Sequence, residues 1–550
     1  MLKIRHLVVY LLIIKSYYYV NAQVTRRNFI GLIGMSGLGL ALKGSAFAAA
    51  RSLVGTPLEA SIEIDFTHPE GTIDDGIYGQ FIEHLGRAIN GGIFEEGSPL
   101  SDAKGVRRDV LEKIRGLQPS ILRYPGGTFT KIYHWMDGIG PLAERRSRPN
   151  LIWGGVENNH FGTDEAIAYA RELWADAYFA VNMGTGTAEE AGNWVEYCNG
   201  TQDTYYANLR RRNGHSDPFN VKYWGIGNEE AAGPDIGRLQ DVKEFVKEAW
   251  LYTKAIKLQD KNAKLVLCGA DDAWNEYVLK EMGAVCDYIS MHHYVSSDRS
   301  KPASLFPQVD HMEELILTLR GQIRTLTPEK VTDFSKWYRF PPRANPVKIA
   351  IDELGIWEPG GTGAYQLEEY YTWEHALGTA TFYNIMLRQA SVVGMATWAQ
   401  TVNVLAPIMT SKTAAVCQTI YYPMQFYRQH AGNVSLKTQV VTPDLKMPGS
   451  KASKALDVAV TLHDNDGSLV IFAVNRHPEQ AVKADLRSID SKKYTPVAVY
   501  ELNATGINAM NTLENPAKNV VTSTEKKPSG NLTDYTFPAH SITAIRYKKM

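Results

Sequence analysis

Cysteine is scarce in this sequence, and the spacing of the few that occur excludes two kinds of stabilisation. The 550 residues include 4 cysteines, and no two of them have the C-x-x-C spacing of a structural zinc site. Their uneven spacing also excludes the dense disulfide framework of a small secreted domain. We therefore expect buried thiols at Cys198, Cys268, Cys286 and Cys417, with a Cys268–Cys286 disulfide as the alternative in an oxidising compartment.

An excess of charge and a long apolar run are both missing. The chain has 58 Lys and Arg against 59 Asp and Glu, whereas a nucleic-acid-binding protein usually carries a basic excess or stripe. Beyond the first fifty residues no apolar run approaches the roughly 20 residues that a membrane-spanning helix needs. We therefore expect no nucleic-acid partner and no membrane segment in the mature protein.

The motifs of several enzyme classes are absent as well. The sequence after the N-terminal segment has no phosphate-binding loop, dinucleotide fingerprint, metal-ligand cluster or G-x-S-x-G motif. His292 and His293 are adjacent, but alternation along a strand would point them to opposite sides. We therefore expect a site without metal or cofactor. The 11 Trp and 29 Tyr exceed what a core requires and suit a pocket with aromatic walls.

The first fifty residues indicate export. Paired arginines in Thr25-Arg26-Arg27-Asn28-Phe29-Ile30 precede an uncharged run to Leu42 and an A-x-A site at Ala46–Ala48. This order is typical of a twin-arginine signal. We predict that residues 1–48 are an export signal and that the mature protein is periplasmic or secreted.

Short apolar runs alternate with helix-like stretches between residues 77 and 398. Near-continuous apolar strands alternating with helices indicate a parallel sheet covered on both faces, and eight such units favour a closed barrel. The eight runs are Ile77–Phe81, Ile121–Tyr124, Ala177–Met183, Tyr223–Gly227, Lys264–Gly269, Tyr288–Met291, Lys348–Ile351 and Val393–Trp398. We therefore predict an α/β fold with a (β/α)₈ TIM barrel over residues 73–414.

The C-terminal part has a different pattern of apolar and polar residues. Alternating stretches separated by turn-rich segments are typical of an antiparallel sandwich. These stretches are Leu456–Leu462, Leu469–Val474, Val497–Leu502 and Ser541–Tyr547. We predict an appended, jelly-roll-like β-sandwich made of residues 52–72 and 415–550, in which Leu58–Phe66 adds a strand. The turn-rich stretch Ala504–Asn531 is expected to be irregular.

Two glutamates stand out at the predicted C-terminal ends of strands, where barrel enzymes hold their active sites. Glu229 follows the fourth strand and Glu353 follows the seventh. Retaining glycosidases need two carboxyl groups roughly 5 to 5.5 Å apart, one as nucleophile and one as acid/base. For either glutamate alone, a buried salt-bridge partner is an equal alternative. Two on these strands favour catalysis.

Several long stretches resemble glycoside hydrolase family 51, which contains α-L-arabinofuranosidases. The stretches are Tyr78–Arg87, Leu122–Gly127, Asp137–Pro141, Phe161–Glu165, Val181–Thr187, Asn213–His215, Trp224–Glu229 and Val402–Ile408. They cover the whole predicted barrel in order. The resemblance implies a retaining, exo-acting enzyme with a (β/α)₈ barrel and a β-sandwich, acting on arabinose-containing oligo- or polysaccharides. It also implies a homo-oligomer.

The resemblance assigns roles residue by residue. It implies that Glu229 is the acid/base and Glu353 the nucleophile. The supporting residues that it implies are Glu83, Arg123, Asn228, His292, Tyr294 and Gln400. Of these, Asn228, Glu83 and Gln400 would contact the sugar. Arg123 and Tyr294 would hold the nucleophile. His292 would set the protonation of the acid/base, with a structural histidine as the alternative.

The sequence departs from the family pattern near the expected sugar. Thr128 replaces the usual Asn after R-Y-P-G-G, and other residues follow both glutamates, in Glu230–Asp235 and Leu354–Trp357. Galactofuranosides, xylosides and β-glucan therefore stay open as substrates. The long connection Ser296–Asn345 would decide between exo and endo action. A non-catalytic carbohydrate-binding protein is the alternative from another class, but both glutamates are present.

Overall fold

The computed structural model describes residues 56–232, 239, 241–327, 343, 345–358, 360–446, 451–528 and 530–550. The predicted export signal lies outside these residues. Gly55–Met550 form one compact unit. Among the described residues, no helix combines the length and hydropathy that crossing a membrane requires.

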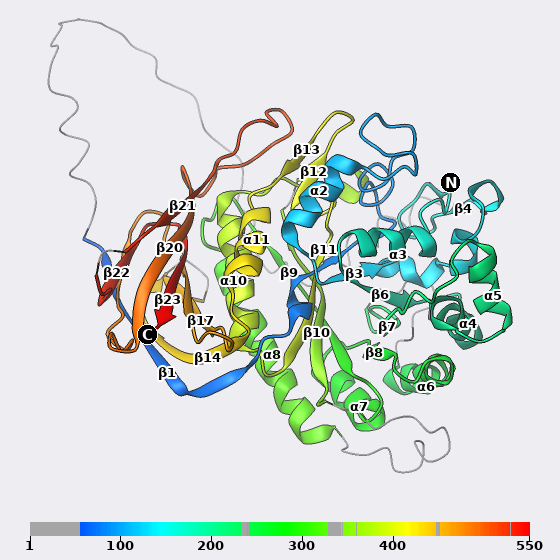
Figure 1. Cartoon of the computed structure of the whole chain (residues 1–550), viewed down its shortest axis with the longest axis horizontal. Coiled ribbons are helices and arrows are strands. Elements are labelled where there is room, and N and C mark those ends of the chain that lie inside the picture. The colour runs from blue at the N-terminus through cyan, green and yellow to red at the C-terminus, as the bar shows by residue number, and fades with distance from the viewer. Residues whose placement is uncertain are drawn as a thin grey trace, which may run out of the picture. The chain divides into compact units, whose positions relative to one another are not determined.

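Eight parallel strands close into a barrel in the order β10-β11-β2-β3-β6-β7-β8-β9 (Figure 1). Their bounds are β2 (Gly79–Phe81), β3 (Ile121–Tyr124), β6 (Asp176–Val181), β7 (Tyr223–Ile226), β8 (Lys264–Leu267), β9 (Tyr288–Ser296), β10 (Lys348–Trp357) and β11 (Val393–Ala399). Every strand overlaps one of the predicted apolar runs. The predicted barrel is therefore confirmed, together with the order of its strands.

Helices surround the barrel in the described part of the chain (Figure 1). They are α2 (Arg108–Leu117), α3 (Thr163–Glu172), α4 (Ala188–Asn199), α5 (Tyr205–Arg212), α6 (Val242–Gln259), α7 (Asp272–Met282), α8 (Phe306–Leu326), α10 (Trp373–Arg388) and α11 (Tyr421–His430). Side-chain caps fix some of their starts, because the first backbone N–H groups of a helix lack partners. Asp271, for example, accepts from Trp274 N at 2.9 Å and begins α7. Helix α8 occupies part of the connection 296–345, of which 328–342 and 344 lie outside the described residues.

The strand ends differ from the prediction at seven of the eight strands, and at β2, β9 and β10 the structure shows the reason. Ile77 and Tyr78 belong to a 3₁₀ turn, Asp75–Tyr78, because Asp74 caps that turn by accepting from Gly76 N. Strands β9 and β10 run on to Ser296 and Trp357, since they stay paired with each other beyond the barrel. Their register shifts between Ala350 and Glu353. Glu353 therefore lies inside β10 and not after it.

The second sheet has nine strands in the order β21-β20-β23-β18-β17-β14-β1-β19-β22. Their bounds are β1 (Leu58–Thr72), β14 (Val434–Val441), β17 (Leu456–Leu462), β18 (Leu469–Asn475), β19 (Val482–Asp485), β20 (Tyr494–Ala504), β21 (Val521–Lys526), β22 (Asp534–Phe537) and β23 (Ile542–Lys549). All neighbours are antiparallel except β1 and β19. The stretch 504–531, expected to be irregular, contains edge strand β21, whose largely exposed residues lack apolar alternation.

The sheet has a core of its own and also shares the core of the barrel. Residues such as Ile62, Val460 and Ile471 form a separate apolar cluster, whereas Val470 and Phe472 point the other way into the barrel's cluster. Helix α10 is buried along its length, and its Asn384 donates to Asp457 Oδ1 at 2.7 Å. The domain boundaries at residues 73 and 415 stay predictions.

The four cysteines are free thiols, so the alternative of a Cys268–Cys286 disulfide is wrong. Cys198, Cys268 and Cys286 are buried, and Cys417 is half-buried. Burial raises the pKa of each buried thiol well above its ordinary range. These thiols therefore act as small apolar side chains.

Candidate active site

The predicted site residues gather at the C-terminal ends of the barrel strands. The ends of β2, β3, β7, β9, β10 and β11 supply Glu83, Arg123, Asn228, Glu229, His292, Tyr294, Glu353 and Gln400. Two neighbouring glycines, Gly126 and Gly127, lie in contact with Glu83 and Glu353. A Cβ on Gly126 would come 2.6 Å from Glu83 Cγ, and one on Gly127 would come 2.4 Å from Glu353 Oε1. Glycine is therefore required where these side chains meet the backbone.

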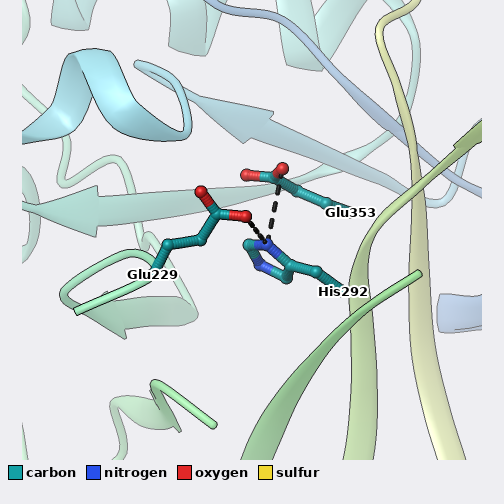
Figure 2. Close-up of side chains that lie close together, drawn as sticks. All are labelled: Glu229, His292 and Glu353. Atoms are coloured by element: carbon teal, nitrogen blue, oxygen red, sulfur yellow. Dashed lines mark hydrogen bonds and ion pairs between the residues drawn. The ribbon is translucent and has the colours of Figure 1, made fainter. Parts of the chain in front are cut away.

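The two predicted catalytic glutamates point at one atom of His292 (Figure 2). Glu229 Oε1 lies 2.9 Å and Glu353 Oε2 lies 3.4 Å from His292 Nδ1. One atom from each of the three residues can be chosen so that all lie within 4.8 Å of one another. The side chain of Glu229 is 34% exposed and that of Glu353 is 8% exposed. The pair is therefore close, and Glu229 is the member that faces solvent.

Arg123 and Tyr294 hold Glu353 from both oxygens. Arg123 Nη1 lies 3.1 Å from Oε1, and the Tyr294 hydroxyl donates to Oε2 at 2.8 Å. The buried Arg123 also donates to the Asp352 carbonyl at 2.7 Å and to Asn228 Oδ1 at 2.6 Å, and it stacks over Phe81. Charge-assisted contacts of this kind fix the position of a carboxylate and favour its ionised form.

Burial and the charges around His292 set the protonation of Glu229 and Glu353. Three carboxylates, those of Glu229, Glu353 and Asp352, surround the His292 imidazole. Burial raises the pKa of Glu353 to about 7, with the charge of Glu229 adding to the rise, although His292 and Arg123 oppose it. Burial alone would lower the pKa of His292, but Glu353, Asp352 and Glu229 outweigh it and raise that pKa well above its ordinary value. His292 lowers the pKa of Glu229 against its burial. Near neutral pH the pair therefore holds one proton, on Glu353 in the absence of substrate, beside an imidazolium.

A second group of polar side chains lies beside Glu353. Glu83 accepts from Phe129 N and from the Trp153 indole, both at 3.0 Å, and from Gln400 Nε2 at 2.8 Å. Among the described residues, Gln400 Oε1 and Asn228 Nδ2 are buried without a hydrogen-bond partner. A buried polar atom without a partner is costly, so both atoms indicate a hydroxyl-bearing ligand.

Sequence reasoning missed two residues of this site. Asp352 is buried behind His292, where it accepts from Tyr178 at 2.7 Å and lies 3.5 Å from His292 Nε2. Arg123 and His292 hold the pKa of Asp352 well below its usual range, against its burial. Trp153 comes from the loop between β4 (Arg148–Pro149) and β5 (Val156–Glu157). Asp352 could have been found as the neighbour of Glu353, whereas no local pattern marks Trp153.

Glu229, His292 and Glu353 could also hold a metal ion by their geometry. The guanidinium of Arg123 already lies 3.1 Å from Glu353, and a second cation beside it would be repelled. His293 points elsewhere, since its Nε2 contacts the Gln308 carbonyl at 3.1 Å. The expectation of a metal-free site stays a prediction.

Comparisons with known proteins identify the family of this chain. A family model for the α-L-arabinofuranosidase 1 domain matches residues 113–314, and one for the α-L-arabinofuranosidase C-terminal domain matches residues 352–541. A probable α-L-arabinofuranosidase C of Aspergillus clavatus is 36% identical over 511 residues, which covers 89% of this chain and 97% of the relative. The chain belongs to the α-L-arabinofuranosidase family.

Two further members of the α-L-arabinofuranosidase family that resemble this chain come from bacteria. An intracellular exo-α-(1→5)-L-arabinofuranosidase of Halalkalibacterium halodurans is 34% identical, covering 79% of this chain and 88% of the relative. The arabinose complex of a Thermotoga maritima α-L-arabinofuranosidase superposes with a TM-score of 0.79 at 36% identity, covering 89% of this chain and 100% of the other. The resemblance read from the sequence is confirmed.

The departures from the family pattern have different structural consequences. Glu230 is buried, and its Oε1 accepts from Asn228 N at 3.2 Å, so it supports the backbone of the site. Leu354 packs in the hydrophobic core. Thr128 begins a 3₁₀ turn, Thr128–Ile132, next to Gly127 and is half-buried. Of these three, Thr128 is therefore the one that is not fully buried, and residues 233–235 lie outside the described part.

Proposed function

We propose that this protein hydrolyses terminal α-L-arabinofuranosides with retention of configuration, using Glu353 as nucleophile and Glu229 as acid/base. The observation that carries the proposal is the short separation, because oxygens of the two glutamates lie within 4.8 Å of each other. Retaining glycosidases have carboxyls roughly 5 to 5.5 Å apart, whereas inverting enzymes need roughly 6.5 to 9.5 Å to admit a water.

The division of roles follows from the contacts of each glutamate. Glu353 accepts hydrogen bonds from Arg123 and Tyr294. These bonds stabilise the carboxylate anion that must attack the anomeric carbon. Glu229 is more exposed and contacts only His292 among these groups. That contact lowers the pKa of Glu229, so Glu229 depends on His292 for the proton that it gives as an acid. His292 can give its Nδ1 proton to Glu229 and take the Glu353 proton in return, since it contacts both carboxylates.

The polar side chains beside Glu353 support recognition of a single terminal sugar. Asn228 Nδ2 is placed to donate to the hydroxyl next to the anomeric carbon, a contact that strengthens as positive charge develops there. Glu83 and Gln400 would bind the remaining hydroxyls, and the Trp153 indole, which donates to Glu83, would hold Glu83 in place. Recognition of one terminal sugar by these groups favours exo action on arabinose-containing oligo- and polysaccharides.

A panel of aryl glycosides tests the proposal. The protein should cleave 4-nitrophenyl α-L-arabinofuranoside far faster than the β-D-galactofuranoside, β-D-xyloside or β-D-glucoside, and NMR should show the α-anomer of arabinose first. A β-anomer as first product would overturn retention. Faster cleavage of another glycoside would overturn the sugar assignment and point to Thr128 as its cause.

We also propose export through the twin-arginine signal in residues 1–48. This proposal rests on the paired Arg26 and Arg27 and on the A-x-A site. Expression in a bacterium that lacks the twin-arginine translocase should leave the protein, with its signal uncleaved, in the cytoplasm. Cleaved protein in the periplasm of such cells would contradict the proposal.

A further inference from the structure

Asp352 and Glu353 are consecutive residues of β10, yet the side chains of both reach His292. In a regular strand, consecutive side chains point to opposite faces. The pairing of β10 with β9 shifts register between Ala350 and Glu353, and an irregularity of this kind re-aims side chains. As a result, Asp352 Oδ1 lies 3.5 Å from His292 Nε2, while Glu353 Oε2 lies 3.4 Å from Nδ1.

Asp352 is a buried carboxylate that the surrounding groups keep ionised. Tyr178 donates to its Oδ2 at 2.7 Å, and Ser290 donates to its Oδ1. Arg123 Nη2 lies 3.8 Å from Oδ2 and favours the anion by its charge. The thiol of Cys268 also interacts with Asp352, but burial raises the pKa of this thiol far enough to keep it neutral. Asp352 therefore presents a fixed negative charge to the ring.

The proposed reaction requires one proton to change places between the two glutamates. The proton lies on Glu353 in the absence of substrate, whereas the reaction needs an ionised Glu353 and a protonated Glu229. His292 Nδ1 contacts both carboxylates (Figure 2). The N–H bond at Nδ1 breaks as Glu229 gains its proton, and a new N–H bond forms there with the proton of Glu353. Between these two steps the ring is neutral and has its single proton on Nε2.

We propose that Asp352 is a positioning residue that keeps a proton on His292 Nε2, so that Nδ1 exchanges protons between Glu229 and Glu353; this inference rests on the proposed function. The partner of one ring nitrogen decides the tautomer of a neutral imidazole, and an anion beside Nε2 favours a proton there. The other tautomer has its proton on Nδ1 and cannot accept one from Glu353.

Asp352→Asn tests this role with little change of shape. Arg123 repels the amide NH₂, which therefore takes the place of Oδ1 and faces His292 Nε2. The ring must then accept at Nε2 and becomes neutral with its proton on Nδ1. In serine proteases the same exchange at the aspartate beside the catalytic histidine preserves the geometry but selects the wrong tautomer, and it lowers kcat roughly 10⁴-fold. We expect kcat/KM on an arabinofuranosyl disaccharide to fall by roughly 10²-fold or more.

The pH profile separates this role from a structural one. The imidazolium lowers the pKa of Glu229 and opposes the rise in the pKa of Glu353. Its loss in Asp352→Asn should move both limbs of the kcat/KM profile upward by roughly one pH unit, because the cation was the nearest charge to both carboxylates. A structural defect would lower the rate and leave both limbs in place. Tyr178→Phe, which removes a hydrogen bond to Asp352 but keeps its charge, is the matched control. This variant should keep kcat/KM within about threefold and both limbs unmoved.

Nitrogen-15 NMR of histidine-labelled protein observes the two ring nitrogens directly, and the signals missing from His292→Gln assign them. In the wild type both nitrogens should carry a proton at pH 7, whereas in Asp352→Asn only Nδ1 should. A wild-type ring without a proton on Nε2 would overturn the inference, and this result does not depend on the folding of any variant at Asp352. An Asp352→Asn protein with unmoved limbs and an unchanged ring would also overturn it. If the wild type hydrolyses no arabinofuranoside, the proposed function fails, whereas the spectra still show whether Asp352 holds the Nε2 proton.

Discussion

Two clusters, each of carboxylates around one histidine, use residues of β10 or the residue that follows it, and the two histidines have opposite electrostatics. In one, His292 contacts Glu229, Glu353 and Asp352, and the pKa of the imidazole is well above its ordinary value. In the other, His375 Nε2 contacts Glu358 at 3.1 Å, yet burial keeps the pKa of His375 below its ordinary value.

The difference lies in what the second ring nitrogen faces. The Thr372 backbone N–H donates to His375 Nδ1 at 2.9 Å, which makes this nitrogen an acceptor and the ring neutral. Both nitrogens of His292 face carboxylates, so both donate. Glu358 is also engaged by Ser297 and Arg299, whereas the proposed catalytic site keeps buried polar atoms without partners, Asn228 Nδ2 and Gln400 Oε1. Residue types alone therefore do not mark a catalytic site; free hydrogen-bonding capacity does.

The largest expected effect comes from removing the proposed nucleophile, Glu353. Glu353→Ala should lower kcat on aryl arabinofuranosides by roughly 10⁴-fold or more, because no covalent intermediate can form. Azide, which is small enough for the vacated space, should restore part of the rate. Glu358→Gln in the other cluster is the control and should keep kcat within about threefold, since surrounding groups are structural. A fully active Glu353→Ala variant would overturn the assignment.

Loss of the acid/base should depend on the leaving group. Glu229→Ala should lower kcat/KM on an arabinofuranosyl disaccharide by about 10² to 10⁴-fold, because a sugar alkoxide needs a proton to depart. On 2,4-dinitrophenyl arabinofuranoside the first step should be nearly unaffected, since that phenolate leaves without help. Steady-state and burst kinetics on the two substrates would show the difference, and equal losses would contradict the acid role.

The pH profile distinguishes the two histidines. The shared proton of the pair is lost near pH 7, so kcat/KM should fall as the pH rises through about 7. His292→Gln removes a cation beside both carboxylates and should move this alkaline limb upward by roughly one pH unit, with a lower maximum. His375→Gln, which removes a neutral ring, should leave the limb in place. A limb that moved equally in both variants would refute the distinction.

Much of this site was accessible from the sequence because barrel strands are short, apolar and buried on both sides. That pattern located β7 and β10 and with them Glu229 and Glu353. Strand β21 was missed because an exposed edge strand needs no apolar alternation. Trp153 was missed because a hairpin loop, not a strand, brings it to Glu83. The neutral state of His375 depends on a backbone N–H, which no residue pattern reveals.

The smallest expected effect concerns stability in the second cluster. Burial raises the pKa of Glu369 to about 9, and the negative charge of Glu358 adds to the rise. The hydrogen bond that Glu369 accepts from the Glu358 backbone N–H opposes it. The folded protein therefore keeps a proton on Glu369 up to about pH 9, whereas the unfolded chain releases it near pH 4 to 5. The contribution of Glu369 to the free energy of unfolding is full below pH 4 to 5 and is lost progressively up to about pH 9. Glu369→Gln keeps the acceptor oxygen without titrating. The Tm of this variant should match that of the wild type at pH 5 and exceed it by a few degrees at pH 8, with kcat unchanged. A Tm lowered equally at pH 5 and pH 8 would show that the Glu369 carboxyl does not titrate in this range.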